Sequence, residues 1–136
     1  MQKIIAALAV AATFTVSAAQ LLTQGDIDAL NHELMNQTGY WMDDVTYFEA
    51  MFIQREGTSI SLIHGLEVAS DFMGDSWVQA QHQKLLPFAE HICNEPMMVM
   101  EARFTDVQST AVYWIYLFDD QPAMFEYQCS DLRSSF

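Results

Sequence analysis

Apolar residues first recur with a helical period soon after residue 20. Thr23 is a favourable N-cap residue, and Asp26 follows it near the expected capping-box position. The apolar positions that fall on one helical stripe are Ile27, Leu30, Leu34 and Met35. Gly39 supplies a typical left-handed residue after a helix. The pattern predicts a first helix over residues 24–37.

Two alternating runs around a short glycine turn predict a β-hairpin. In residues 45–54 one alternating set is Val45, Tyr47, Glu49, Met51 and Ile53, and the other is Phe48, Ala50 and Phe52. Residues 55–58 form the turn, with Gly57 inside it. In the second run Ile60, Leu62 and His64 alternate with Ser59, Ser61 and Ile63.

A second helix is expected from Asp75 or Ser76 to about Cys93. Its apolar stripe contains Trp77, Leu85, Phe88 and Ile92. Pro87 interrupts this stretch, so the helix should be kinked there or restart. Residues 97–104 fit either a short helix or an extended link.

The C-terminal third is the most strand-like part of the chain. Residues 110–118 form a nearly continuous apolar and aromatic run, typical of a central strand covered on both faces. After a turn at 119–122, one face is shared by Ala123, Phe125, Tyr127 and Cys129. The expected fold is an α+β domain ordered helix, β-hairpin, helix, β-hairpin, with the helices on one face of a small antiparallel sheet and one disulfide.

The first 19 residues have the composition of a secretory signal peptide. Lys3 gives a basic start, an apolar run extends from Ile4 to Val16, and Ala19 completes an A-x-A-like cleavage site before Gln20. The run is shorter than the about 20 residues that a spanning helix needs. We therefore expect a signal peptide over 1–19, one domain over 20–136, and a periplasmic or secreted product; an uncleaved anchor is the alternative.

The two cysteines, Cys93 and Cys129, both follow the expected signal. In an oxidising compartment such a pair indicates one disulfide, which would join the second helix to the last strand. A thiol pair for metal binding or redox work is the alternative, but the spacing matches no C-x-x-C motif.

Charge limits the kinds of partner. The chain has 18 acidic residues against 5 lysines and arginines, and its net charge is -13. Such a protein repels nucleic acid and anionic lipid surfaces, whereas a basic protein partner is compatible. The same charge also serves to keep an exported protein soluble and monomeric.

A resemblance begins at Cys93, where the chain reads C-N-E-P, continues into V-Y-W-I-Y-L-F, and ends with F-E-Y-Q-C. This pattern resembles a group of small exported bacterial proteins with a C-x-x-P motif, a Y-x-Y-like strand and a final cysteine, most of them without an assigned activity. The resemblance implies the α+β fold and the bridge between Cys93 and Cys129, but no reaction. Members often have a glycine before the penultimate strand, where this chain has residues 106–109 without one.

No motif for catalysis, a metal or a cofactor is present. His82 and His91 lack the i, i+4 spacing of a helical zinc pair, and we expect the histidines to lie on surfaces or at interfaces. The acidic pairs at 43–44 and 119–120 lack the mid-loop glycine of a calcium loop. The chain contains no G-x-S-x-G elbow. Met97, Met98 and Met100 cluster, which suits core packing or a contact surface better than copper binding.

Three hypotheses follow for the function. The preferred one is a non-catalytic periplasmic domain that binds another envelope protein, as an assembly accessory, inhibitor or immunity protein; Tyr40, Trp41 and Trp77 are the candidate contacts. The second is a binder of a small apolar ligand between sheet and helices, with a pocket made by Phe48, Phe52, Trp114 and Phe125. The third is a small hydrolase or metal enzyme.

Overall fold

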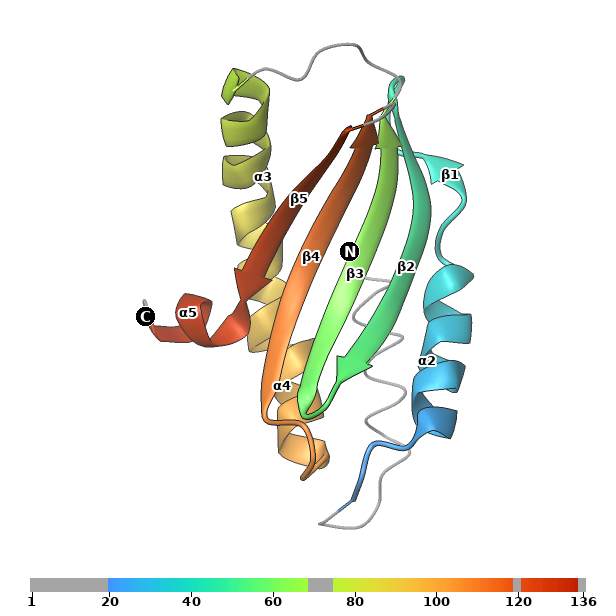
Figure 1. Cartoon of the computed structure of the whole chain (residues 1–136), viewed down its shortest axis with the longest axis vertical. Helices are drawn as coiled ribbons and strands as arrows, with labels where there is room; N and C mark the ends of the chain where they lie inside the picture. The colour runs from blue at the N-terminus through green and yellow to red at the C-terminus, as the bar shows by residue number, and fades with distance from the viewer. Residues whose placement is uncertain (1–19, 69–74, 119–120, 135–136) are drawn as a thin grey trace.

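The computed structural model describes residues 20–68, 75–118 and 121–134, and it shows an α+β domain built around one five-stranded sheet (Figure 1). In chain order the elements are α2 (Gln24–Met35), β1 (Tyr40–Trp41), β2 (Thr46–Glu56), β3 (Ser59–Val68), α3 (Asp75–Asn94), α4 (Pro96–Arg103), β4 (Ser109–Phe118), β5 (Gln121–Gln128) and α5 (Cys129–Ser134). The strands lie side by side in sequence order. The expected signal peptide lies outside the described residues.

Helix α2 begins where its local sequence predicts. The Thr23 hydroxyl accepts a hydrogen bond from the Asp26 backbone N–H, and the Asp26 carboxylate accepts one from the Thr23 backbone N–H, each over 3.1 Å. This capping box satisfies two of the free N–H groups at the helix start. The helix buries Ile27, Leu30 and Leu34, while Met35, which we expected on the same stripe, is exposed.

The first hairpin joins β2 and β3 through a turn at Gly57, whose φ of 62° suits glycine. A β-bulge between Phe48 and Ala50 shifts the register of β2. Because the bulge adds one residue, Phe48 and Met51 both point into the core, although alternation places them on opposite faces. The expected division of β2 into two faces is therefore wrong before the bulge.

The sheet is mixed, and the prediction of an antiparallel sheet is corrected at its centre, where β3 and β4 pair in parallel. The reason is the helical connection between the hairpins. Helix α3 has 20 residues and spans about 30 Å, close to the about 33 Å of the 10-residue strand β3. The chain thus returns to the end where β3 began, and β4 runs in the same direction as β3.

Alternate residues of the two central strands enter a single core. On β4 these are Thr110, Val112, Trp114, Tyr116 and Phe118, and on β3 they are Ile60, Leu62, His64, Leu66 and Val68. The intervening β4 residues are less uniformly covered: Tyr113 and Ile115 are half-buried and Leu117 is exposed. The expectation of a strand buried equally on both faces is therefore wrong.

Helix α3 is continuous through Pro87. Pro87 and Gln83, whose carbonyl loses its helical N–H partner, are both exposed, so water can replace the missing bond. The next segment, 97–104, is helical over Pro96–Arg103 rather than extended, and it buries Met97 and Met100 in the core.

The disulfide between Cys93 and Cys129 is present, with the Cα atoms 5.2 Å apart. It does not end on the last strand as expected, because Cys129 is the first residue of α5, a short helix that the sequence pattern did not indicate. The bridge therefore joins α3 to α5. Arg133 of α5 adds hydrogen bonds to the Cys93 carbonyl and to Glu101 of α4.

Candidate functional site

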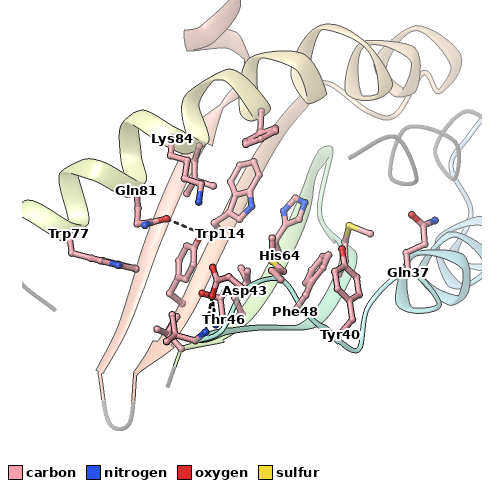
Figure 2. Close-up of a pocket in the computed structure, with 18 residues that line it drawn as sticks. Gln37, Tyr40, Asp43, Thr46, Phe48, His64, Trp77, Gln81, Lys84 and Trp114 are labelled. Carbon is pink, nitrogen blue, oxygen red and sulfur yellow. Dashed lines mark hydrogen bonds between the residues drawn. The ribbon is translucent and has the colours of Figure 1, made fainter. Parts of the chain in front are cut away.

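A cavity of about 350 Å³ lies between the sheet and helix α3. Strands β2, β3 and β4 form its floor, α3 forms one wall, and the segment from the end of α2 to the start of β2 forms the other (Figure 2). Its volume is in the range of small-molecule pockets in proteins. Apolar and aromatic side chains dominate the lining, with a few polar groups among them.

Three rings from adjacent strands form a stack on the floor. The His64 imidazole lies parallel to the Trp114 indole, with ring centroids 4.4 Å apart and an interplanar angle of 6°. Phe48 follows on the other side, at 6.1 Å and 24°. The β3–β4 register places His64 directly opposite Trp114, while Phe48 lies opposite Leu66 and is a diagonal neighbour of His64 across β2 and β3.

Helix α3 contributes Trp77, Gln81 and Lys84 to the wall, spaced so that one helix face looks onto the cavity (Figure 2). The Trp77 indole meets the Tyr116 and Phe118 rings edge to face, at 5.4 and 4.8 Å between centroids. Such pairs fix ring orientation and add to the energy of burial. This end of the cavity therefore has a defined aromatic shape.

His64 is the most unusual residue of the lining because it is an ionisable side chain on a core strand and is only 2% exposed. Its Nδ1 lies 3.1 Å from the Tyr113 carbonyl, and its Nε2 is buried without a hydrogen-bond partner among the described residues. Burial lowers the pKa of His64 to about 4, although the bond to Tyr113 opposes this change. The ring is therefore neutral at pH 7.

The remaining polar groups lie around the rings. The Asp43 carboxylate accepts hydrogen bonds from the backbone N–H groups of Val45 and Thr46, at 2.9 and 2.8 Å, and the Val45 bond is the main cause of its lowered pKa. Burial raises the pKa of Tyr116 to about 12, and its hydroxyl donates to Gln81 Oε1 over 3.4 Å. Tyr116 thus stays neutral.

The residues proposed as partner contacts separate into two groups. Tyr40 and Trp77 line the cavity, and Tyr40 is also 46% exposed. Trp41 does not line it: the residue is 59% exposed, and its ring packs edge to face on Tyr47. The exposed apolar side chains near β1 are Tyr40, Trp41, Met42 and Val45.

Two of the four residues proposed for a ligand pocket, Phe48 and Trp114, line the cavity. Phe125 is buried beside it, in edge-to-face contact with Tyr116, and is not part of the lining. Phe52 pairs with Ile63 in the hairpin, on the side of the sheet away from the cavity.

From the sequence we did not identify His64 as a site residue, and we expected the histidines to lie on surfaces or at interfaces, whereas His64 is buried. A signal was present, because Ile60, Leu62 and His64 occupy successive positions of one alternating set. A histidine that continues a buried apolar set is a candidate for a functional core position. Gln37 and Gln81 carried no comparable signal. Gln37 follows α2 and Gln81 lies on α3, and both have many polar neighbours in the sequence.

Among the residues that the structure describes, no three histidine, cysteine, aspartate or glutamate side chains form a group that could hold a metal ion. Both cysteines are in the disulfide. Within the same ranges, no helix combines the length and apolar character that crossing a bilayer requires.

Comparison with known proteins identifies no relative: no protein-family model, no curated protein and no solved structure matches the chain. The resemblance to small exported bacterial proteins therefore stays a prediction. The functional proposal rests on the geometry of the cavity and on the sequence.

Proposed function

We propose that this protein is a non-catalytic binding domain of the periplasm whose cavity takes a small, mainly apolar molecule. The observation that supports this function is the space of about 350 Å³ between sheet and α3, lined by Phe48, Trp77 and Trp114. The space is open to solvent on one side, since its lining includes the exposed side chains of Tyr40 and Met42. A mainly apolar cleft of this size is typical of small-molecule sites. Aromatic walls suit a flat apolar body.

The polar groups around the cavity suit binding better than reaction. Asp43 and Lys84 lie in the lining with opposite charges, and the Asp43 carboxylate is already held by two backbone N–H groups. Tyr116 is neutral, and His64 has a pKa well below neutrality, which makes it a weak base at pH 7. No serine, threonine or cysteine nucleophile stands beside His64 among its described contacts.

The export signal and the disulfide support the compartment. The disulfide indicates folding in an oxidising environment, and the predicted signal peptide would deliver the chain there. A carrier or sensor of small molecules in the periplasm is consistent with both features.

The test of this function is a cavity-filling substitution. Leu66 is 2% exposed and lines the cavity, so Leu66→Trp should occupy the space. We expect wild-type protein to bind 2-methoxynaphthalene, an apolar probe without a hydrogen-bond donor, with a dissociation constant of about 10 to 100 μM by calorimetry. Leu66→Trp should weaken this binding at least tenfold.

The matched control is Glu67→Trp, the next residue of β3, whose side chain is exposed. It adds the same ring to the same strand but outside the cavity, and binding should persist. Equal binding by both variants, or no binding by the wild type, would contradict the proposed function.

A protein partner is a second candidate function, supported by the exposed apolar side chains at the sheet edge, Tyr40 and Trp41 above all. The net charge of -13 favours a basic partner. A partner captured from periplasmic extract and then purified should bind Trp41→Ala at least tenfold more weakly than wild type, and more weakly still in high salt. Unchanged affinity of the variant would argue against this surface.

A further inference from the structure

Two residues that line the cavity each carry a buried hydrogen-bond acceptor without a donor within the described ranges. His64 Nε2 and Gln37 Oε1 are both buried without a partner among the described residues, and both residues belong to the lining. Buried polar atoms of native proteins are nearly always hydrogen-bonded, so two orphaned atoms at one cavity require an explanation.

The chemistry of each atom is fixed by its neighbour. The Tyr113 carbonyl can only accept, so His64 Nδ1 at 3.1 Å must carry the proton. In a neutral imidazole the other nitrogen, Nε2, is then unprotonated and accepts. Gln37 Nε2 lies toward the Glu33 carbonyl at 3.5 Å, which leaves the amide oxygen of Gln37 as a second acceptor.

Resting on the function proposed above, we propose that the ligand is a neutral aromatic molecule with a hydroxyl or N–H group that donates a hydrogen bond to His64 Nε2. The aromatic body would lie among Phe48, Trp77 and Trp114. Because Nε2 has almost no accessible surface while the cavity is empty, neighbouring side chains must move on binding before the donor reaches the orphaned nitrogen. Phenol-like and indole-like compounds have this chemistry.

Charged ligands fit the same site less well. An anion would be attracted by Lys84 but repelled by Asp43 in the same lining and by the lone pairs of His64 Nε2 and Gln37 Oε1. A cation would be attracted by the aromatic faces and by Asp43 but repelled by Lys84 in the same lining, and its burial would cost hydration. A purely apolar ligand would leave Nε2 without a partner, so it would bind more weakly than a ligand of the same shape that donates a hydrogen bond there.

The experiment compares two probes of nearly the same shape, 2-naphthol and 2-methoxynaphthalene, which differ in whether the oxygen can donate. We expect wild-type protein to bind 2-naphthol about tenfold more tightly, the ratio that about 1.4 kcal/mol produces. Simple partition into an apolar space gives the opposite order, because the ether is the more apolar molecule. In His64→Phe the preference should disappear while 2-methoxynaphthalene still binds.

The matched control is His32→Phe, which replaces an exposed histidine of α2 and should keep the tenfold preference. Because His64→Phe could impair folding, the wild type gives a second readout by nitrogen NMR. The His64 Nε2 resonance should shift on addition of 2-naphthol and stay in place with 2-methoxynaphthalene.

The outcomes separate the inference from the function on which it rests. Binding of both probes with equal affinity, with no change at Nε2, would overturn the donor requirement and leave an apolar binding domain. Binding of neither probe would overturn the proposed function and the inference together.

Discussion

At the scale of single residues, His64 combines features that rarely occur together. It is buried, neutral and stacked on Trp114, and one ring nitrogen is held by the Tyr113 carbonyl. The backbone bond fixes the tautomer, and the stack fixes the ring plane. His64 therefore holds one hydrogen-bond acceptor, Nε2, in a fixed direction without a protein partner in the described part of the chain, as a side chain that recognises a ligand would.

The burial of His64 has a consequence for stability against pH. Its pKa is 6.5 in the unfolded chain and about 4 in the folded protein, so between these values only the unfolded chain binds the proton. The stability associated with His64 is present above pH 6.5 and is lost as the pH falls toward 4, by about 3 kcal/mol.

Chemical denaturation of wild type and His64→Phe at pH 7 and pH 4.5 measures this effect. Asp43, Lys84, Tyr40 and Tyr116 also line the cavity and are common to both proteins, so the difference between their pH slopes isolates His64. We expect the wild type to lose more stability than the variant. Equal slopes would show that His64 titrates normally in the folded state.

At the scale of elements, the disulfide holds the long wall helix of the cavity in place. It joins the end of α3 to the start of α5, and α5 also contacts β4. Arg133 of α5 donates to Glu101, which in turn accepts from the Thr110 hydroxyl over 2.7 Å. These contacts attach α3 to the sheet at the end away from Trp77.

Loss of the disulfide should therefore weaken folding. The cysteines are 36 positions apart, and closing a loop of this length stabilises the folded state by about 4 kcal/mol in the chain-entropy model. The double variant Cys93→Ala, Cys129→Ala should unfold at lower denaturant than oxidised wild type, and reduced wild type should behave like the variant. Identical midpoints for oxidised and reduced wild type would contradict this role.

Local signals in the sequence predicted several elements well. Thr23 and Asp26 form a capping box through their own side chains, and Gly57 supplies a turn conformation that other residues rarely adopt. The bulge after Phe48 has no such signal, because an extra residue in a strand depends on the partner strand. Helix α5 was missed because period-two alternation of the preceding residues continued through Cys129.

At the scale of the whole molecule, the parallel pairing of β3 and β4 makes the site possible. It aligns His64 directly with Trp114, because the two strands run in the same direction in this register. Sequence patterns did not reveal this pairing, because each hairpin is antiparallel within itself. The relative direction of β3 and β4 depends on the length of the helical connection between the hairpins. The cavity itself depends on the spacing between α3 and the sheet, which side chains distant in sequence determine.

The most direct test of the binding function is a crystal structure of the wild-type protein grown with 2-naphthol. We expect the naphthol ring in the cavity between β3 and α3, against Phe48, Trp77 and Trp114. Its oxygen should lie about 2.6 to 3.2 Å from His64 Nε2. A cavity closed by movement of α3 onto the sheet, or one filled only by water while naphthol lies elsewhere, would contradict the proposed binding function.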